Sequence, residues 1–484
     1  MGRIGKTMAR RKKKNKNKNI IGKFLATVFT IVMVLGCFRI YTMDLLPIKY
    51  LGTCLGFVFI ITFVINLLLT KTAVNKHIRT FAGLLATLFI FVMGMGYFYM
   101  NETMDFLNNM TNQKLQNVTY YVMVSNDSSA TKLSDIKDGT IGVNSLFPIQ
   151  KAIQSLQNKV AVTDKKYASG TKLVDDVVDQ KIEAILISES YKALFEESNQ
   201  KFKKNTKVIY QFTLAEDATK QKSKIDVTKD VFSVYISGID TYGSIANVAR
   251  SDVNILATVN PNTHKILLTS VPRDYYVKLH GVEGYRDKLT HAGVYGIDMS
   301  LKTMEDLLET TVPYYLRINF STLIKSVDAL GGIDVYSDTT FTAYNGETFQ
   351  QGMNHLNGQS ALAFARERKV FAGGDRMRGE HQEAVITAMI DKMTSSAMVS
   401  NYSQILKSLD GSFNTNMTSK EISALVRKQI DQGSKWTVES FRLDGTDSYN
   451  YTYTYDTQQL YVMEPDWDTV SQAIAKINAI GQAN

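Results

Sequence analysis

Apolar residues are distributed in two different ways along this chain. Three apolar stretches of about twenty residues each fill most of the first hundred positions: Ile20–Phe38, Tyr50–Thr70 and Thr80–Met100. An apolar helix of about 20 residues is long enough to cross the hydrocarbon layer of a membrane. After residue 100 the apolar runs shorten to the length of a strand or a helix face, and polar turns separate them. We therefore expect three membrane-spanning helices followed by a large water-facing part.

The positions of the basic residues predict which way these helices cross the membrane. Residues 1–18 contain nine Lys and Arg residues and no acid, and the loop between the second and third stretches carries Lys71, Lys76 and Arg79. Loops rich in Lys and Arg stay on the cytoplasmic side. No A-x-A-like cleavage site follows the first stretch, which argues against a cleaved signal peptide. The sequence predicts a multi-pass protein of the cell membrane, with a cytoplasmic N-terminus and with residues 101–484 outside.

The net charge of +9 comes from the N-terminal tail, residues 1–18. The nine basic residues of the tail account for all of it, so the rest of the chain is formally neutral. We interpret the tail as a topology signal that contacts anionic membrane lipid, and not as a nucleic-acid-binding arm. The two cysteines, Cys37 and Cys54, both lie in the apolar stretches, so the outer part uses no disulfide framework.

The pattern divides the chain into three regions: residues 1–100 (tail and spans), 101–225 (a small accessory α/β domain with a linker) and 226–484 (a larger α/β domain). In the accessory domain we expect strands and helices in alternation, at 120–124, 139–143, 148–157, 172–180, 184–188 and 191–197. Residues 215–230 are polar and charged and predict a linker. No nucleophile or metal-type cluster occurs in this domain, so docking or regulation is its expected role.

The larger domain is expected to be a sheet layered with helices. Buried-type strands are predicted at Val231–Ser237, Val253–Val259 and Lys265–Val271. Helices are predicted at 298–310, 320–330, 358–366, 378–398, 401–409, 419–432 and 467–480.

Candidate chemistry collects at the ends of these strands. Asp240 follows the first strand and Asp252 precedes the second, so both carboxylates could face one cation if the strands are neighbours. Mg²⁺ takes one or two carboxylates together with phosphate oxygens. Each aspartate alone also has a structural explanation: Asp240 could cap a turn, and Asp252 could pair with its neighbour Arg250.

The remaining candidates are arginines, whose forked guanidinium groups suit phosphate oxygens. Arg273 follows Pro272, whose fixed backbone could aim it. Arg378 and Gln382 are four residues apart and would share a helix face. A structural alternative for Asp375 is the N-cap of that helix. The structural alternative for Arg366 and Arg368 is that they are basic residues at the C-terminal end of a helix. We expect His291 to have a structural role.

The chain contains, in order, the segments Gly238-Ile239-Asp240, Ala249-Arg250-Ser251-Asp252, Val271-Pro272-Arg273-Asp274, Asp287-Lys288-Leu289-Thr290-His291-Ala292, Ala365-Arg366-Glu367-Arg368 and Gly374-Asp375-Arg376-Met377-Arg378, followed by Gln382. This ordered set resembles the LytR–CpsA–Psr family. With three spans and an intervening α/β domain, the chain is similar to the capsule-biosynthesis branch of that family. Gly379-Glu380-His381-Gln382 departs from the family pattern, so no role is carried over to positions 380 and 381.

The resemblance implies a phosphotransferase that moves a capsular polysaccharide from a polyprenyl-pyrophosphate carrier to peptidoglycan and forms a phosphodiester. It implies Mg²⁺ on Asp240 and Asp252, and pyrophosphate binding by Arg250, Arg273, Arg366, Arg368, Arg378 and Gln382. It gives catalytic roles to Asp240, Arg273, Asp375 and Arg378, with Asp375 the first candidate base and Asp240 the second. It also implies an apolar tunnel for the lipid tail, which we expect along the apolar face of the 378–398 helix.

Two alternatives remain open from the sequence. The same site could hydrolyse a polyprenyl pyrophosphate, with water in place of the sugar hydroxyl. The chain could also be a non-enzymatic regulator of capsule assembly or of transcription, although only the tail and short loops would face the cytoplasm. The expected partners are the lipid-linked polysaccharide, peptidoglycan and membrane lipid. Other capsule-assembly proteins are further candidates, and nucleic acid is not expected to be a partner.

Overall fold

The structure is a computed structural model of the 484-residue chain. It describes residues 2–484 except 45–46, 72–73, 112–114, 146–148, 218–223, 240–248, 285, 372–374, 394–412, 456–457 and 483–484. For residues 2–19, 110, 115–117, 197–198, 216–217 and 375 only the backbone is described. Contacts divide the chain into two compact units, Met1–Asn108 with Thr418–Ser434, and Asn109–Met417 with Lys435–Asn484.

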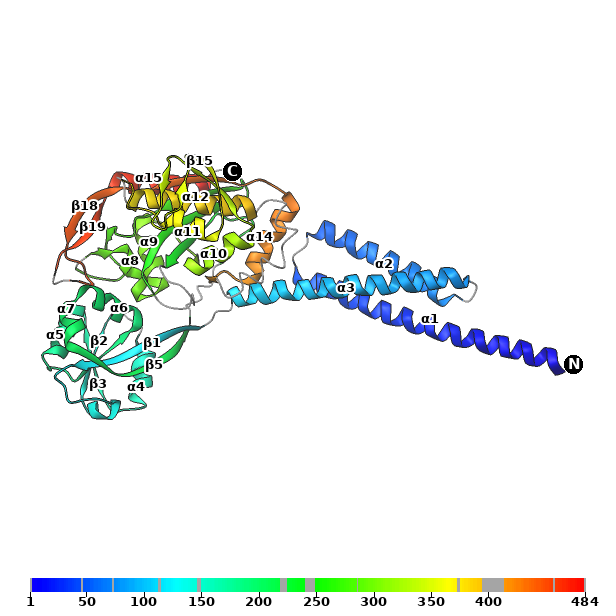
Figure 1. The fold of residues 1–484 in the computed structure, drawn as a ribbon, viewed down its shortest axis with the longest axis horizontal. Coiled ribbons are helices and arrows are strands. Elements are labelled where there is room, and N and C mark those ends of the chain that lie inside the picture. The colour runs from blue at the N-terminus through cyan, green and yellow to red at the C-terminus, as the bar shows by residue number, and fades with distance from the viewer. Residues whose placement is uncertain are drawn as a thin grey trace. The chain divides into compact units, whose positions relative to one another are not determined.

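Three long helices form most of the first unit: α1 (Gly2–Met43), α2 (Ile48–Thr70) and α3 (Lys76–Thr111) (Figure 1). Each contains a segment long and apolar enough to cross a membrane, namely Ile20–Met43, Ile48–Thr70 and Lys76–Asn109. Large apolar side chains on these helices are exposed, as expected where lipid and not water surrounds them; Phe24, Phe59 and Phe91 are examples. The three predicted spans are therefore present as helices. Helix α3 continues beyond the third apolar stretch as far as Thr111.

A fourth helix, α14 (Ser419–Gln432), belongs to the same unit, although more than three hundred residues separate it from the end of α3. The Nζ of Lys49 forms a salt bridge with Asp431 at 2.7 Å, and Arg427 donates to the backbone oxygen of Asp44 at 2.8 Å. Asp44 and Lys49 lie at the ends of α1 and α2. The helix predicted at 419–432 therefore forms, and its polar side chains bind the ends of two of the apolar helices.

The accessory domain contains a five-stranded sheet in the order β3-β2-β4-β1-β5 (Figure 1). Its strands are β1 (Leu115–Ser125), β2 (Thr140–Asn144), β3 (Thr163–Tyr167), β4 (Ala184–Ser188) and β5 (Thr206–Asp217), and its helices are η1 (Leu133–Ile136), α4 (Gln150–Gln157), α5 (Gly170–Val178), α6 (Glu189–Ser198) and α7 (Gln200–Asn205). Strands β3 and β5 were not predicted from the sequence, because both carry many polar residues. Strand β5 also includes the first three residues of the predicted linker.

A six-stranded sheet in the order β16-β11-β6-β7-β8-β17 forms the centre of the larger domain. The strands are β6 (Phe232–Ile239), β7 (Ser251–Asn260), β8 (Lys265–Ser270), β11 (Tyr314–Asn319), β16 (Asn414–Thr415) and β17 (Thr437–Arg442). Strands β6, β7 and β8 are antiparallel, whereas β11 pairs parallel with β6 and β17 pairs parallel with β8. The ends of β6, β8, β11 and β17 and the start of β7 therefore meet at one edge of the sheet.

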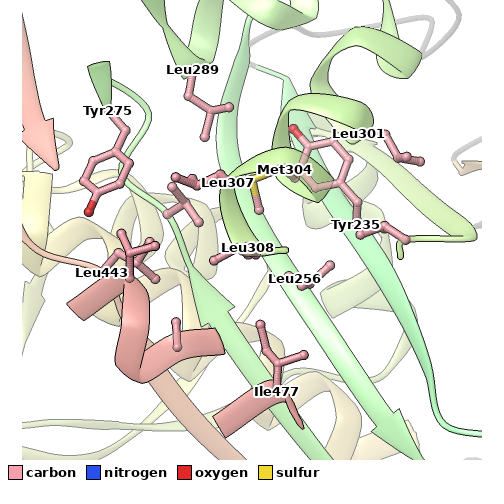
Figure 2. Close-up of a cluster of buried hydrophobic side chains, with 14 of the residues drawn as sticks. Tyr235, Leu256, Tyr275, Leu289, Leu301, Met304, Leu307, Leu308, Leu443 and Ile477 are labelled. Atoms are coloured by element: carbon pink, nitrogen blue, oxygen red, sulfur yellow. The ribbon is translucent and has the colours of Figure 1, made fainter. Parts of the chain in front are cut away.

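Successive side chains of these strands alternate between two helix-covered faces. On one face Tyr235 and Leu256 pack with Met304 of α9 (Ile297–Leu308) and Ile477 of α15 (Trp467–Gln482), as Figure 2 shows. On the other face Ile236, Ile255 and Leu268 pack with Ile386 of α12 (Asp375–Met393). Helices α10 (Phe320–Ala329) and α11 (Gly358–Arg366) lie near α12 in the chain, and α11 contacts both. The α/β fold class with layered helices is confirmed.

Smaller elements complete this domain. They are β9 (Tyr276–Val277) paired with β10 (Asp287–Lys288), β12 (Ile333–Ser337) with β15 (Gly352–Leu356), β13 (Phe341–Thr342) with β14 (Thr348–Phe349), β18 (Gly445–Asn450) with β19 (Leu460–Pro465), and the short helices α8 (Leu289–Ala292) and η2 (Gly293–Tyr295). The helix predicted at 401–409 lies outside the described residues.

The accessory domain shares a buried cluster with the larger domain. Tyr191 and Phe195 of α6 pack with Tyr295 and Tyr455. The ring centres of contacting pairs in this group lie 4.6–6.3 Å apart. Fully buried Asp287 lies beside this cluster and accepts hydrogen bonds from the backbone N–H and the hydroxyl of Thr454. The accessory domain therefore contacts the same segment that supplies residues 287–292 to the sheet edge.

Candidate active site

Asp252 and Arg273 form the centre of the site. Asp252 is the second residue of β7, and Arg273 comes three residues after β8, so the antiparallel pairing of these strands brings the two side chains to one edge. The Nη1 of Arg273 donates to Oδ1 of Asp252 at 2.6 Å, and the hydroxyl of Thr290 lies 3.3 Å from the same oxygen. The backbone N–H of Thr290 also donates to the Arg273 carbonyl at 2.8 Å. Residues from three separate sequence motifs therefore meet here.

Asp274 fixes the other side of the Arg273 guanidinium. Its Oδ2 lies 3.3 Å from Nε of Arg273, and its Oδ1 lies 3.0 Å from Nζ of Lys288. Burial alone would raise the pKa of Asp274, but the positive charges of Lys288 and Arg273 outweigh it, so the pKa lies below its ordinary value. Asp274 is therefore an ionised buried carboxylate that orients Arg273 between two acids.

An apolar pocket opens beside Asp252, between the sheet and helices α10, α11 and α12. Its lining is mainly apolar, and we call the polar lining residues Asp252, Arg366 and Gln382 its rim. The remaining lining residues are Asn319, which caps α10, and Gly238, Ile239, Val253, Ile318, Phe320, Leu323, Leu362, Ala365, Val385 and Ile386. An apolar tunnel was predicted along the 378–398 helix, and this pocket is lined by Gln382, Val385 and Ile386 of α12; that it holds a lipid tail stays a prediction.

Arg366 is held at this rim by aromatic rings. Its guanidinium carbon lies 4.2 Å from the ring centre of Phe320 and 5.3 Å from that of Tyr344, which is cation–π geometry. The next residue, Glu367, fixes the turn after α11. Burial would raise the pKa of Glu367, but hydrogen bonds from the backbone N–H groups of Lys369, Tyr344 and their neighbours lower it below the ordinary value. The end of α11 is thus a rigid support for Arg366.

Helix α12 supplies Arg378 and Gln382 at positions that share one helical face. Glu383 points elsewhere, since it is buried beside Ser270 and Ser440, where burial raises its pKa to about 8. Glu380 forms an ion pair with Arg442 at the end of β17. The helix begins at Asp375, whose side chain is not described.

Arg317 lies on β11, between β16 and β6 in the sheet, and is fully buried. Its Nη2 lies 3.5 Å from the carbonyl oxygen of Ala249, and burial lowers its pKa. Within the described part of the chain, its Nε and Nη1 have no hydrogen-bond partner. The guanidinium is next to the chain segment that precedes Asp252, so it adds positive charge behind the site.

Of the two predicted metal ligands, only Asp252 lies among the described residues. Asp240 lies outside them. Both contacts that involve the Asp252 carboxylate within the described part use Oδ1, so Oδ2 could serve as a cation ligand. No group of three or more His, Cys, Asp or Glu residues with metal-binding geometry occurs in the described ranges. A site with one or two carboxylates and phosphate oxygens, as Mg²⁺ uses, fits this arrangement.

The structure thus brings Asp252, Arg273, Arg366 and Gln382 to one region. Arg250 directly precedes β7, and Arg368 is exposed just after α11. His291 is buried with its Nδ1 2.6 Å from Asp287 and is structural, as expected. Asp274, Lys288 and Thr290 lie within the quoted motifs but no role was predicted for them, and Arg317 lies outside every motif. A charged residue inside a strand-like run was the available signal for Arg317, whereas the pairing of Asp274 with Lys288 depends on tertiary structure.

Comparison with known proteins agrees with the motif order. A model of the LytR_cpsA_psr family matches residues 186–466, more than half of the chain. The chain belongs to the LytR–CpsA–Psr family. The polyisoprenyl-teichoic acid–peptidoglycan teichoic acid transferase TagU of Bacillus mycoides is 36% identical over 203 residues, which are 42% of this chain and 65% of that relative. The corresponding transferase TagT of Bacillus subtilis is 35% identical over 243 residues, 48% of this chain and 73% of the relative.

The chain spans 65% of the TagU relative's length, slightly less than two thirds. Two solved structures are also similar. The crystal structure of Bacillus subtilis TagV has a TM-score of 0.45 and 27% identity, covering 53% of this chain and 99% of that one. The structure of TagT (YwtF) with bound octaprenyl pyrophosphate lipid has a TM-score of 0.41 and 28% identity, covering 55% and 96%.

Proposed function

We propose that this family member is a Mg²⁺-dependent phosphotransferase that moves a capsular polysaccharide from a polyprenyl-pyrophosphate carrier to peptidoglycan. Its relatives are named as transferases that act between a polyisoprenyl-linked polymer and peptidoglycan, which supports an enzyme that transfers a glycopolymer. The choice of a capsular polysaccharide over teichoic acid rests on the resemblance of the three spans and accessory domain to the capsule-biosynthesis branch.

One observation carries the proposal: a charged cluster suited to phosphate lies at the mouth of an apolar pocket. Asp252, Arg366 and Gln382 form the polar rim, and Arg273 bonds directly to Asp252. A polyprenyl pyrophosphate has the matching form, with an apolar chain joined to a charged head. The tail would occupy the pocket between the sheet and α12, and the pyrophosphate would lie at the rim.

In this mechanism the residues position and neutralise charge, as phosphoryl transfer requires. Arg273, held between Asp252 and Asp274, and Arg366, held by Phe320 and Tyr344, would bind pyrophosphate oxygens. Asp252, with Asp240 as its proposed partner, would hold Mg²⁺, which when bound supplies positive charge to the same oxygens. Arg250, Arg368, Arg378 and Gln382 are proposed as further phosphate contacts.

The bond changes follow from this placement. An acceptor sugar hydroxyl attacks the phosphorus that carries the polymer, and the new P–O bond forms in line with the bond to the bridging oxygen. The bridging bond breaks, and polyprenyl phosphate leaves along the apolar pocket. The hydroxyl proton goes to a carboxylate, for which Asp375 is the first proposed base and Asp240 the second.

The decisive experiment uses the full chain in lipid nanodiscs with a labelled polyprenyl-pyrophosphate oligosaccharide. We expect label on soluble peptidoglycan fragments in the presence of Mg²⁺, and loss of transfer in Asp240→Ala and Asp252→Ala variants that still fold and insert. Near-normal transfer by Asp240→Ala would remove the metal assignment. Release of free oligosaccharide phosphate at the same rate without acceptor would instead identify a hydrolase.

We also propose that residues 101–484 lie outside the cytoplasm, on the side where lipid-linked sugars reach the wall. The basic tail and second loop support this orientation. A Ser129→Cys variant, with Cys37 and Cys54 replaced by serine, should react with a membrane-impermeant maleimide in intact cells. Reaction only after lysis would reverse the proposed topology.

A further inference from the structure

A second and wider hollow lies on the larger domain, formed by the segment between β9 and β10, the end of α9 and the start of α15. It encloses about 1150 Å³, including the space open to solvent, against about 520 Å³ for the apolar pocket measured in the same way. Its lining residues include Tyr276, Lys278, His280, Glu283, Arg286, Asp306, Glu309 and Trp467. We call it the polar groove. No step of the proposed transfer mechanism uses these residues.

The charged and polar side chains that line the polar groove are largely paired with one another or with an adjacent residue. Lys278 lies 3.7 Å from Glu283, and the Nδ1 of His280 lies 2.8 Å from Asp306. Arg286 pairs with Glu464 at 3.7 Å. A groove that bound a phosphate or an acidic chain would need a surplus of cations. Internal pairing instead leaves many donors and acceptors with little net field, which suits a neutral ligand rich in hydroxyl groups.

The groove also offers an aromatic surface and an apolar floor. Trp467 is 54% exposed at the first position of α15, although large aromatic side chains are usually well covered. Leu307, Val470 and Ile474 also line the groove and supply its aliphatic surface. A flat ring beside polar groups suits the apolar face of a sugar ring. The aliphatic floor suits the methyl group of an N-acetyl substituent.

A chain of side-chain contacts along the β9–β10 ribbon links the groove to the active site. Tyr276 and Lys288 are directly paired across the ribbon, and directly paired residues project from the same face. The guanidinium carbon of Arg286 lies 5.9 Å from the ring centre of Tyr276, and Lys288 forms an ion pair with Asp274. These contacts lead from the groove, through Lys288, to Asp274, the carboxylate that holds Arg273.

We propose that the polar groove binds the acceptor: a neutral, N-acetylated glycan strand that follows the β9–β10 ribbon to the active site. This inference rests on the proposed transferase function, because it gives that function a place for its second substrate. Trp467 stacks on a sugar ring, the aliphatic floor receives an N-acetyl methyl group, and the paired side chains around them bind hydroxyl groups. The glycan hydroxyl that attacks then lies beyond Lys288, toward Arg273.

Binding can be measured without any transfer. The chain has two tryptophans, and Trp436 packs against the ring of His264 at 5.2 Å, so a Trp436→Phe background leaves Trp467 as the only tryptophan reporter. In the full chain in nanodiscs, we expect the N-acetylglucosamine tetramer to change Trp467 fluorescence in a saturable way. Maltotetraose, which lacks N-acetyl groups, should bind about tenfold more weakly or not at all, the loss expected for about 1.4 kcal/mol of contact. An absent response, or an equal response to both sugars, would overturn the assignment.

The second measurement separates acceptor binding from folding. Trp467→Ala should raise the KM for soluble glycan acceptor about tenfold and leave kcat within about twofold, because a ground-state contact is lost. The matched control is Tyr336→Ala, which removes another exposed aromatic side chain of the same domain, outside the groove, and should leave the KM unchanged. An unchanged KM in Trp467→Ala would overturn the proposal.

The two proposals can fail separately. If the tetramer binds but the wild-type chain transfers nothing, the groove stands as a glycan site and the transferase function fails. If transfer occurs, but the tetramer does not bind and the acceptor KM does not change in Trp467→Ala, the transferase function stands and the groove assignment fails.

Discussion

The apolar pocket and the polar groove lie on opposite helix-covered sides of one sheet and differ in what their walls offer. The pocket lies against α10, α11 and α12, and its charged groups are confined to its rim. The groove lies against α9 and α15, and its polar groups are spread along its length and paired with one another. The pocket is lined by Asp252, which binds Arg273, whereas the groove is linked to Arg273 only through Lys288 and Asp274. Under the proposed function, this difference would keep a lipid tail and a sugar chain apart while their reacting groups meet near Arg273.

The largest expected effect comes from the residue where the two regions meet. Arg273→Ala should lower kcat for transfer by about a thousandfold, in the range found when an arginine that stabilises a phosphoryl-transfer transition state is removed. The change also leaves Asp252 and Asp274 without their shared cation. Transfer is measured with labelled donor, and tetramer binding is measured by Trp467 fluorescence.

If the apolar pocket and the polar groove are separate binding regions, Arg273→Ala loses transfer but keeps glycan binding. Arg273→Lys is the matched variant, since it keeps the charge but loses the fork that contacts both acids. Loss of glycan binding in Arg273→Ala, with folding intact, would mean that the groove and the phosphate site are not separate regions.

The second-largest expected effect is on stability and concerns Glu383 of α12, the helix that forms one wall of the apolar pocket. Glu383 is buried on α12 and its pKa is raised from 4.5 to about 8, mainly by burial. The folded state therefore binds more protons than the unfolded state between these values, and stability falls as pH rises through this window. The expected loss is of the order of a few kcal/mol, levelling off above about pH 8.

Glu383→Gln should remove this slope, because the amide stays neutral at every pH in the window. Urea unfolding of the full chain at pH 5.5, 7 and 8.5 measures it. Glu439→Gln is the matched control, since Glu439 is an exposed carboxylate on β17, next to Ser440. The same slope in Glu383→Gln as in the wild type would show that the neutral carboxyl does not stabilise the pocket wall.

The third effect tests the apolar character of the pocket itself. Leu323 lines it from α10 and is only partly buried, so a substitution there is compatible with folding. Leu323→Gln should raise the KM for the polyprenyl donor by about tenfold, since an amide would face the lipid without a hydrogen-bond partner. Leu323→Met keeps the surface apolar and should behave like the wild type. Equal donor KM values for both variants would argue against a lipid tail in this pocket.

The sequence predicted the framework of the site but not all of its contacts. The apolar runs located β6, β7 and β8, and the family resemblance assigned Asp252 and Arg273 to the same predicted site, although their direct contact was not predicted. Strand β11, between β6 and β16 in the sheet, was missed because polar Arg317 and Asn319 interrupt its apolar run. Local pattern therefore predicts a strand only where its residues remain apolar.

Tertiary contacts explain the other differences. Arg366 was expected to bind phosphate, but its stacking on Phe320 and Tyr344 depends on α10 and a hairpin that the local sequence does not specify. The ion pair between Lys288 and Asp274 likewise needs the β9–β10 pairing. Asp240, the most important predicted metal ligand, lies outside the described residues, so its role stays a prediction.

The smallest expected effect tests the rim of the polar groove. Glu309 ends α9 in the left-handed region, with φ 47° and ψ 40°, where glycine is the usual residue. Glu309→Gly should therefore raise the free energy of unfolding by up to about 1 kcal/mol, because strain is relieved. The same change should weaken tetramer binding by about twofold, since one exposed carboxylate acceptor leaves the groove. Asp138→Gly is the matched control: Asp138 has φ 64° in the accessory domain, so it should change stability without changing glycan binding. Greater stability with unchanged affinity in Glu309→Gly would place the glycan away from this end of the groove and confine the contact to Trp467 and the β9–β10 ribbon.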